Sequence, residues 1–166
     1  IQADQQEWDA FVLSCPAASP YHLFAWITAI KKAYGHEMYP LIARQNGEVV
    51  GVLPLVHLRL AFFINELVAL PFCDVGNCLS TSSVVEERLL AEALKIGKQL
   101  RTRNIQLRGQ LHSKDNANSS FTQLKSSKVR MMLNLPDSSD ALLEEFKSKL
   151  RSQIRKAENN GIAFRW

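Results

Sequence analysis

An Asn-Gly dipeptide at residues 46–47 separates two apolar-rich stretches and constrains the fold more than any other short motif in the chain. Such a dipeptide between strand-like stretches is typical of a two-residue hairpin turn, so Glu37–Arg44 and Val49–Arg59 are predicted to pair as antiparallel strands. Pro54 removes a backbone donor within the second strand, which favours an edge position or a bulge there. The chain is therefore expected to contain an antiparallel sheet.

Apolar spacing predicts two helices before this hairpin and two after it. They span Gln5–Ser14, Leu23–Tyr34, Val84–Arg103 and a last region from Asp137 or Ser138 to about Asn159. Gly35 and Gly161 are expected to end two of them, and Ser83 to cap the start of the third. Further strands are expected at Glu66–Pro71, Asn104–Arg108 and Lys128–Leu135, with polar loops at Phe72–Ser83 and His112–Ser120.

This order of elements is typical of an α/β (α+β) fold, with a mixed, largely antiparallel sheet flanked by helices. The 166 residues are 46% hydrophobic and 22% charged, which excludes a disordered chain and is enough for a sizeable core. No apolar run approaches the roughly 20 residues that span a bilayer. The chain starts at Ile1, and Gly161–Trp166 has the pattern of a turn followed by the start of a strand, so we expect a fragment of a longer protein.

The three cysteines, Cys15, Cys73 and Cys78, are few and odd in number, which favours reduced, buried thiols and a cytoplasmic location. Cys73 and Cys78 have no nearby pair of histidines, so they make a poor zinc pattern and no metal site is expected. Trp8, Tyr21 and Trp26 stand at helical positions with the spacing of core residues, and all three are interpreted as packing residues.

The net charge of the chain is concentrated in one segment. Five of the ten residues from Lys147 to Lys156 are cationic and none is anionic. Removing those five from the 20 Lys and Arg leaves 15 cations against 16 acids, so this segment supplies the whole excess of +4. A focused excess of this kind indicates an anionic partner such as a phosphate, although a solvated basic helix face explains the charge alone about equally well.

Helical spacing arranges the last region into faces. An apolar stripe contains Leu142, Phe146, Leu150, Ile154 and Ala157. Lys147, Arg151 and Arg155 fall on the adjoining face at i, i+4 and i+8, and Lys149 and Lys156 flank the other side. Because like charges at i, i+4 repel, three stacked cations favour a binding role over a purely structural one.

The run from Lys149 to Ile162 resembles a signature of FemAB-like proteins, a Lys-x-Arg-x-x-Ile-Arg-Lys-Ala-x-x-x-Gly pattern near the junction of two GNAT-like domains. The upstream half is similar to members associated with exosortase/PEP-CTERM exopolysaccharide loci. It carries Trp8-Asp9-x-Phe11, Trp26, Tyr34-Gly35-His36, Gly51-Val52-Leu53-Pro54-Leu55, Leu70-Pro71-Phe72 and Lys128-Val129-Arg130-Met131. The resemblance implies a first GNAT-like domain at 1–136, followed at 137–166 by the basic helical segment and the start of a truncated second domain.

The resemblance further implies an acyl- or aminoacyltransferase that forms an amide on a peptidoglycan precursor or an exopolysaccharide-related acceptor. Lys147, Arg151, Arg155 and Lys156 are then the residues expected to bind phosphate, because arginine presents a bidentate fork. Asp74 and His36 are weaker candidates for contacting the acceptor. The expected partners are a nucleotide- or lipid-linked envelope precursor and, through the missing half, aminoacyl-tRNA, in the cytoplasm or at the inner face of the membrane.

The chain departs from ordinary GNAT enzymes in the stretch before its long helix. There an Arg/Gln-x-x-Gly-x-Gly/Ala loop would grip the pyrophosphate of acetyl-CoA, but Cys73–Ser80 offers one glycine, Gly76, and Asn77 stands where relatives carry a second. No cofactor is therefore expected in this half. Two other roles stay open for the basic segment: contact with RNA such as a tRNA acceptor stem, and non-catalytic docking between domains. The catalytic residues stay unassigned.

Overall fold

The computed structural model describes residues 2–60, 63–109, 111, 121–122, 129 and 131–162 of the chain. The chain divides into two compact units, residues 1–123 and 124–166, and each is described by itself. The expected loop at His112–Ser120 and the strand expected after Gly161 fall almost wholly outside the described residues. No described helix has both the length and the apolar character needed to cross a bilayer.

The first unit is built on a mixed sheet with strand order β1-β2-β3-β5, in which β4 also pairs with β2. The strands are β1 (Glu37–Gln45), β2 (Glu48–Leu60), β3 (Ile64–Ala69), β4 (Leu79–Ser80) and β5 (Asn104–Gln106). All pairings are antiparallel except that of β3 with β5. The predicted hairpin is confirmed: Asn46 and Gly47 have φ of 52° and 89°, as a tight hairpin turn with left-handed central residues requires.

Pro54 does not lie at an edge or a bulge, which corrects the expectation from the sequence. It lies inside the central strand β2, opposite Pro40 of β1. Its carbonyl accepts from the Leu70 N–H at 3.2 Å, on the β3 side. Both main-chain groups of a strand residue point to the same side, so the missing N–H of Pro54 also faces away from β1. The pairing of β2 with β3 begins at the next residue, Leu55, so the missing N–H of Pro54 lies at the end of that ladder.

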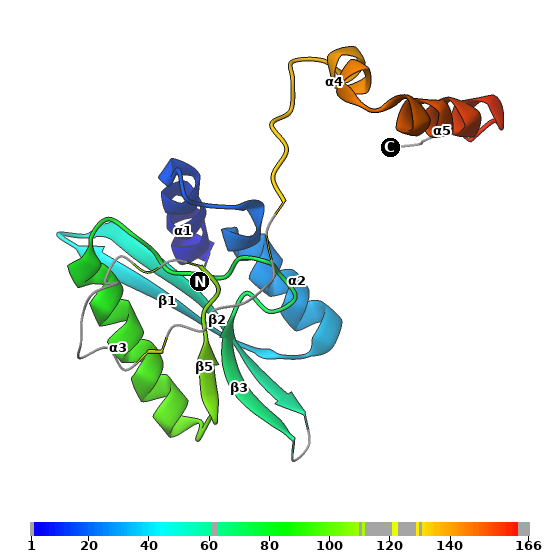
Figure 1. Cartoon of the computed structure of the whole chain (residues 1–166). Helices are drawn as coiled ribbons and strands as arrows, with labels where there is room; N and C mark the ends of the chain where they lie inside the picture. The colour runs from blue at the N-terminus through cyan, green and yellow to red at the C-terminus, as the bar shows by residue number, and fades with distance from the viewer. Residues whose placement is uncertain are drawn as a thin grey trace. The chain divides into compact units, whose positions relative to one another are not determined.

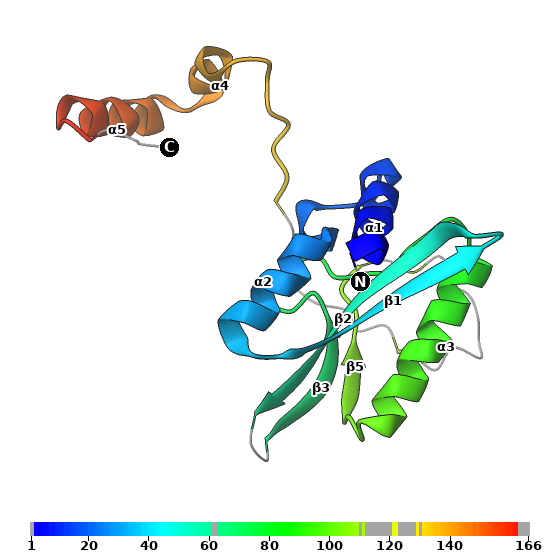
Figure 2. The ribbon, with the colours of Figure 1, turned by 180° about the vertical axis from the view of Figure 1, so that it is seen from behind.

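Helices cover both faces of this sheet (Figures 1 and 2). On one face α1 (Gln2–Ser14) and α2 (Phe24–Tyr34) pack with alternate residues of β2 such as Val52 and Val56. On the other face α3 (Ser83–Gln99) packs with the intervening residues Leu53 and Leu55. Successive residues of β2 therefore point into the two cores in turn. Because both faces of the strand are buried, its sequence is almost continuously apolar. A short 3-10 helix, η1 (Pro20–His22), precedes α2.

The long helix differs from its predicted bounds at both ends. Its N-cap is Ser82 and not Ser83, because the Ser82 hydroxyl accepts from the Val85 N–H at 3.4 Å. Two serines in sequence can each serve as a cap, and spacing alone does not choose between them. The helix ends at Gln99 and not Arg103, since Arg101 has a φ of 54° and turns the chain into β5.

The described residues of the second unit form two helices where one was expected, α4 (Ser139–Glu145) and α5 (Ser148–Asn159). Phe146 has a ψ of 144° and separates them. The sequence predicted one continuous helix because Leu142, Phe146 and Leu150 keep helical spacing. Apolar spacing does not reveal that the backbone of a single residue is extended. Gly161 ends α5 with a φ of 73°, as expected.

The strand predicted at Lys128–Leu135 is absent from the described residues of that stretch, 129 and 131–135. Its alternating apolar residues are exposed, with Met131 86% and Leu135 74% accessible. A strand needs a neighbour for its backbone hydrogen bonds, and no described strand pairs with this stretch.

Candidate functional site

The loop that follows β3 has an unusual backbone. Leu70 and Phe72 have φ of 48° and 68°, the left-handed region that costs a non-glycine residue about 1 kcal/mol or more. Gly76 lies so close to the end of β3 that a Cβ there would be 2.1 Å from the Ala69 carbonyl oxygen. The loop therefore folds back tightly over the end of the strand and holds its residues in fixed positions.

Arg108, two residues after β5, forms hydrogen bonds with this loop. Its main chain exchanges two hydrogen bonds with Gly76, at 2.8 and 2.6 Å, and its guanidinium donates to the Cys73 carbonyl at 2.7 Å. The N–H of Gly76 is thus used by the Arg108 carbonyl and is not aimed at a phosphate. Arg108 also lowers the pKa of the Cys73 thiol, but burial is the larger effect and raises it, so the thiol stays protonated at neutral pH.

Aromatic side chains from η1, α2, the turn after α2 and this loop form two partly exposed groups, which we together call the aromatic ridge. It consists of Tyr21, Trp26, Tyr34, His36 and Phe72. The Tyr34 and Phe72 rings have centroids 4.9 Å apart, and both residues are 61% exposed. His36 stacks on Tyr34 at 6.1 Å, and Tyr21 packs against Trp26 at 4.8 Å.

Burial raises the pKa of the Cys73 thiol and Trp26 opposes this, so Trp26 lies near the residue next to Phe72. Trp8 is fully buried as predicted, but Trp26 is 38% exposed, so its interpretation as a core residue is wrong. Helical spacing identifies the face of α2 that is turned toward the protein. It does not show which residues of that face stay exposed because no other segment covers them.

The two weaker candidates lie near the ridge. His36 is half-buried at its end, stacked on Tyr34. Asp74 is exposed in the strained loop, two residues after Phe72. The fold thus brings His36 and the Asp74 loop to one surface through the contact between Tyr34 and Phe72. Among the described residues, no cluster of three His, Cys, Asp or Glu is arranged to hold a metal ion.

Sequence reasoning missed His22, which is fully buried below this loop. Its Nδ1 accepts from the Ser19 N–H at 3.1 Å, so the proton of the neutral ring lies on Nε2, which donates to Oδ1 of Asn77 at 3.2 Å. Burial lowers the pKa of His22 below its usual 6.5, and the hydrogen bonds only partly oppose this. A lone histidine in a Pro-Tyr-His stretch carries no pattern that could have revealed the contact.

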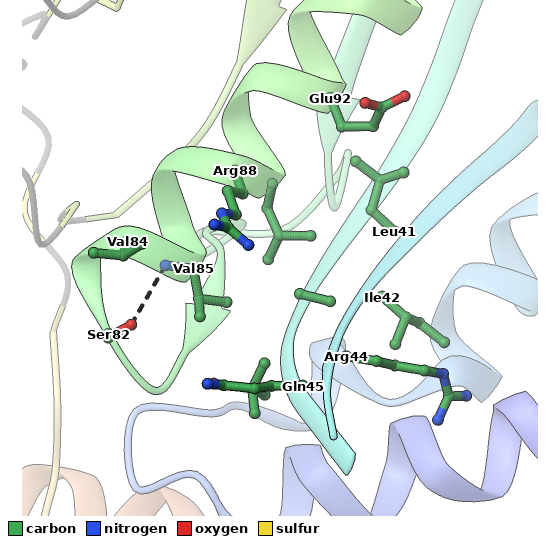
Figure 3. A pocket seen from close by; sticks show the side chains of 12 residues that line it. Leu41, Ile42, Arg44, Gln45, Ser82, Val84, Val85, Arg88 and Glu92 are labelled. Atoms are coloured by element: carbon green, nitrogen blue, oxygen red, sulfur yellow. Dashed lines mark hydrogen bonds between the residues drawn. The ribbon is translucent and has the colours of Figure 1, made fainter. Parts of the chain in front are cut away.

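A groove of about 490 Å³ lies between the edge strand β1 and the start of α3 (Figure 3). Leu41, Val85 and Leu89 give it apolar walls, and Arg44, Arg88 and Glu92 give it charges. Arg44 forms ion pairs with Asp4 and Glu7, and Glu92 with Lys95. The groove contains none of the residues predicted from the sequence.

In the second unit, α5 carries most of the predicted phosphate-binding residues. Arg151, which is half-buried, and the exposed Arg155 are one turn apart, as predicted, and Lys156 follows them. Lys147 lies outside the helix, where its carbonyl accepts from the Arg151 N–H at 3.1 Å. This is a helical i, i+4 bond, so Lys147 lies one turn before Arg151, at the residue that precedes the helix. Within the described part of the chain, none of the four forms an ion pair.

The solved structure of a ribosomal-protein-alanine N-acetyltransferase from Brucella melitensis biovar Abortus 2308 matches 78% of this chain and 93% of its own length, with a TM-score of 0.51 and 12% identity. The chain has a GNAT-like, acyltransferase-type fold. A crystal structure of FemX matches 59% of the chain at 24% identity and a TM-score of 0.47, and the match spans only 24% of FemX. No family model matches the chain, and no curated protein matches it.

Proposed function

We propose that this chain is part of a FemAB-like acyl- or aminoacyltransferase that forms amide bonds on a cell-envelope acceptor, a peptidoglycan precursor or an exopolysaccharide-related one. The observation that carries the proposal is the FemAB-like signature on α5, whose Arg151 and Arg155 form no described ion pair, in a chain with a GNAT-like fold. In such a reaction an activated ester meets a neutral amine, and the protein positions both and stabilises the oxyanion.

Lys147, Arg151, Arg155 and Lys156 act in this proposal as the phosphate-binding group for a nucleotide- or lipid-linked precursor. Two arginines one turn apart can each present two parallel donors to phosphate oxygens, and lysines add point charges. The aromatic ridge offers rings to an uncharged part of the acceptor, with Asp74 and His36 as its polar neighbours. Aminoacyl-tRNA is the proposed donor, and the proposed location is cytoplasmic or at the inner face of the membrane.

The order of elements in the second unit supports two successive GNAT-like domains, proposed at 1–136 and from 137 onward. In the first unit, α1 and α2 are followed by a left-handed glycine, Gly35, and then by β1. In the second, α4 and α5 are followed by the left-handed Gly161. The same sequence of helix, helix and glycine is thus used twice.

Binding of a UDP-linked muropeptide, measured by calorimetry on the whole chain, tests the proposal. We expect binding that the double variant Arg151→Gln/Arg155→Gln weakens by at least a hundredfold, since the charge-assisted hydrogen bonds of each arginine contribute about 1.5–3 kcal/mol. Arg88→Gln, an exposed arginine on α3 of the first unit, is the matched control and should bind normally. Equal affinity in all three proteins would contradict the assignment of α5.

A role in RNA binding is the second candidate, favoured by the concentration of the whole charge excess between Lys147 and Lys156. Binding of a tRNA acceptor stem that falls steeply with salt would support it, because each neutralised phosphate adds to the salt dependence. Salt-insensitive binding, or none, would remove it. A domain-docking role predicts that the double variant lowers stability and leaves acceptor affinity unchanged.

A further inference from the structure

The hairpin between β2 and β3 ends in an exposed apolar tip. Leu60 is 61%, Phe63 80% and Ile64 37% exposed. The Phe63 N–H donates to the Leu60 carbonyl at 3.1 Å and closes the turn. Single exposed apolar residues are common on proteins, but three at one turn indicate an interaction surface.

The Asn65 side chain forms hydrogen bonds between the β2–β3 hairpin and the neighbouring turn between α3 and β5. Its Oδ1 accepts from Nε2 of His57 at 2.7 Å, and its Nδ2 donates to the carbonyls of Leu100 and Arg101 at 3.3 and 2.8 Å. Figure 1 shows the hairpin end and the start of β5 at the same end of the first unit. These hydrogen bonds place the β2–β3 hairpin beside the turn between α3 and β5.

Cations lie at the same end of the first unit as the apolar tip. Arg59, Lys98, Arg101 and Arg103 are all exposed, and the Arg103 guanidinium donates to the Phe63 carbonyl at 3.3 Å. Over the described residues of 57–66 and 98–106, the one carboxylate is Glu66, which accepts from the Asn104 amide at 3.0 Å. This end of the unit thus combines an apolar tip with four cations and one acid.

We propose that this end of the first unit docks on the surface of a membrane that contains anionic phospholipid. Leu60, Phe63 and Ile64 enter the interface, while the basic residues beside them contact the phosphates of the headgroups. An apolar tip with exposed cations beside it matches a bilayer, in which apolar chains lie directly beneath negative phosphates. A protein partner would need an apolar pocket with an acidic rim, whereas any membrane with anionic phospholipid already has this arrangement. The proposal does not depend on the transferase function.

Sedimentation of the whole chain with vesicles tests the proposal. We expect it to bind phosphatidylcholine vesicles that contain phosphatidylglycerol, and to bind pure phosphatidylcholine weakly. The tip variant Leu60→Ser/Phe63→Ser should bind at least tenfold more weakly. Arg59→Gln and Arg101→Asn should each weaken binding about fivefold, in line with the usual contribution of one cation near an anionic surface. Asparagine is chosen for Arg101 because it tolerates the positive φ.

Matched controls separate this surface from the rest of the chain. Phe72→Ser removes an aromatic ring of comparable exposure from the aromatic ridge, and Arg88→Gln removes an exposed arginine from α3. Arg88→Gln should bind vesicles as the original chain does, and Phe72→Ser should bind them far more strongly than the tip variant. Far-UV circular dichroism checks that the tip variant is folded, and its affinity for a UDP-linked muropeptide should be unchanged, which keeps this test separate from that of the transferase.

Three outcomes would overturn the proposal. The first is no binding to anionic vesicles. The second is a tip variant that binds like the original chain while Arg151→Gln/Arg155→Gln does not, because α5 would then be the membrane contact. The third is self-association in solution that the tip variant abolishes without any vesicle binding, because the surface would then serve a second copy of the chain.

Discussion

Tyr34 and Phe72 hold their ring centroids 4.9 Å apart on the surface of the first unit, although Phe72 has a left-handed backbone. Neither ring is buried, so the packing gained by this contact is small. A strained residue that presents an exposed ring is more readily explained by a binding role than by stability. The aromatic ridge is for this reason the best candidate in the first unit for contact with an acceptor.

Phe72→Gly tests this explanation. Glycine relieves the left-handed strain of about 1 kcal/mol, while it adds unfolded-state entropy and removes the Tyr34 contact. We expect the free energy of unfolding in urea to change by no more than about 0.5 kcal/mol and acceptor affinity to fall. Phe11→Ala, in the core, should cost about 3–5 kcal/mol in the same measurement. A comparable loss in Phe72→Gly would show that the ring serves stability.

Gly76→Ala should disrupt the loop after β3. A Cβ would lie 2.1 Å from the Ala69 carbonyl oxygen, so the loop or the strand must move, and we expect a loss of about 2–4 kcal/mol in urea unfolding. Gly47→Ala is the control, because its Cβ would meet no atom within 4 Å and only its φ of +89° is unfavourable. It should cost about 1 kcal/mol. Equal losses in the two variants would contradict the close contact.

Acid should destabilise the first unit through His22. The pKa of His22 is lowered below 6.5 in the folded chain, so the unfolded chain binds the extra proton first as the pH falls. Above pH 6.5, His22 does not change the free energy of unfolding. Below pH 6.5 this free energy falls by at most about 1.4 kcal/mol per pH unit, until the pH reaches the pKa of His22 in the folded chain. Urea unfolding at several pH values should show that His22→Gln lacks this component. An identical pH dependence in both proteins would exclude His22 as its source.

The three thiols should react with iodoacetamide at different rates. Cys78 is 3% exposed and its pKa is raised to about 12, mainly by burial and also by Glu86, so about one thiol in ten thousand is ionised at pH 8. Cys73 is buried with a raised pKa, and Cys15 is half-buried. Mass spectrometry of the native chain should find Cys15 labelled first and Cys78 last, with similar rates in urea. Early labelling of Cys78 would contradict its burial.

The sequence predicted those features that depend on neighbouring residues. The Asn46-Gly47 turn, the glycine that ends α2 and the i, i+4 pair Arg151 and Arg155 each follow from local rules, and all are present. The aromatic ridge and the contact of His22 with Asn77 join residues 38 to 55 positions apart, which no local pattern encodes. The break at Phe146 was missed because apolar spacing persists across it.

The proposed role of Arg151 and Arg155 is tested most directly by comparing two ligands, a UDP-linked muropeptide and the same muropeptide without its diphosphate. Calorimetry with the whole chain should give an affinity at least a hundredfold higher for the diphosphate form, since two arginines each contribute about 1.5–3 kcal/mol. The Arg151→Gln/Arg155→Gln variant should lose most of this preference. A chain that binds both ligands equally, or neither, would contradict the proposed function.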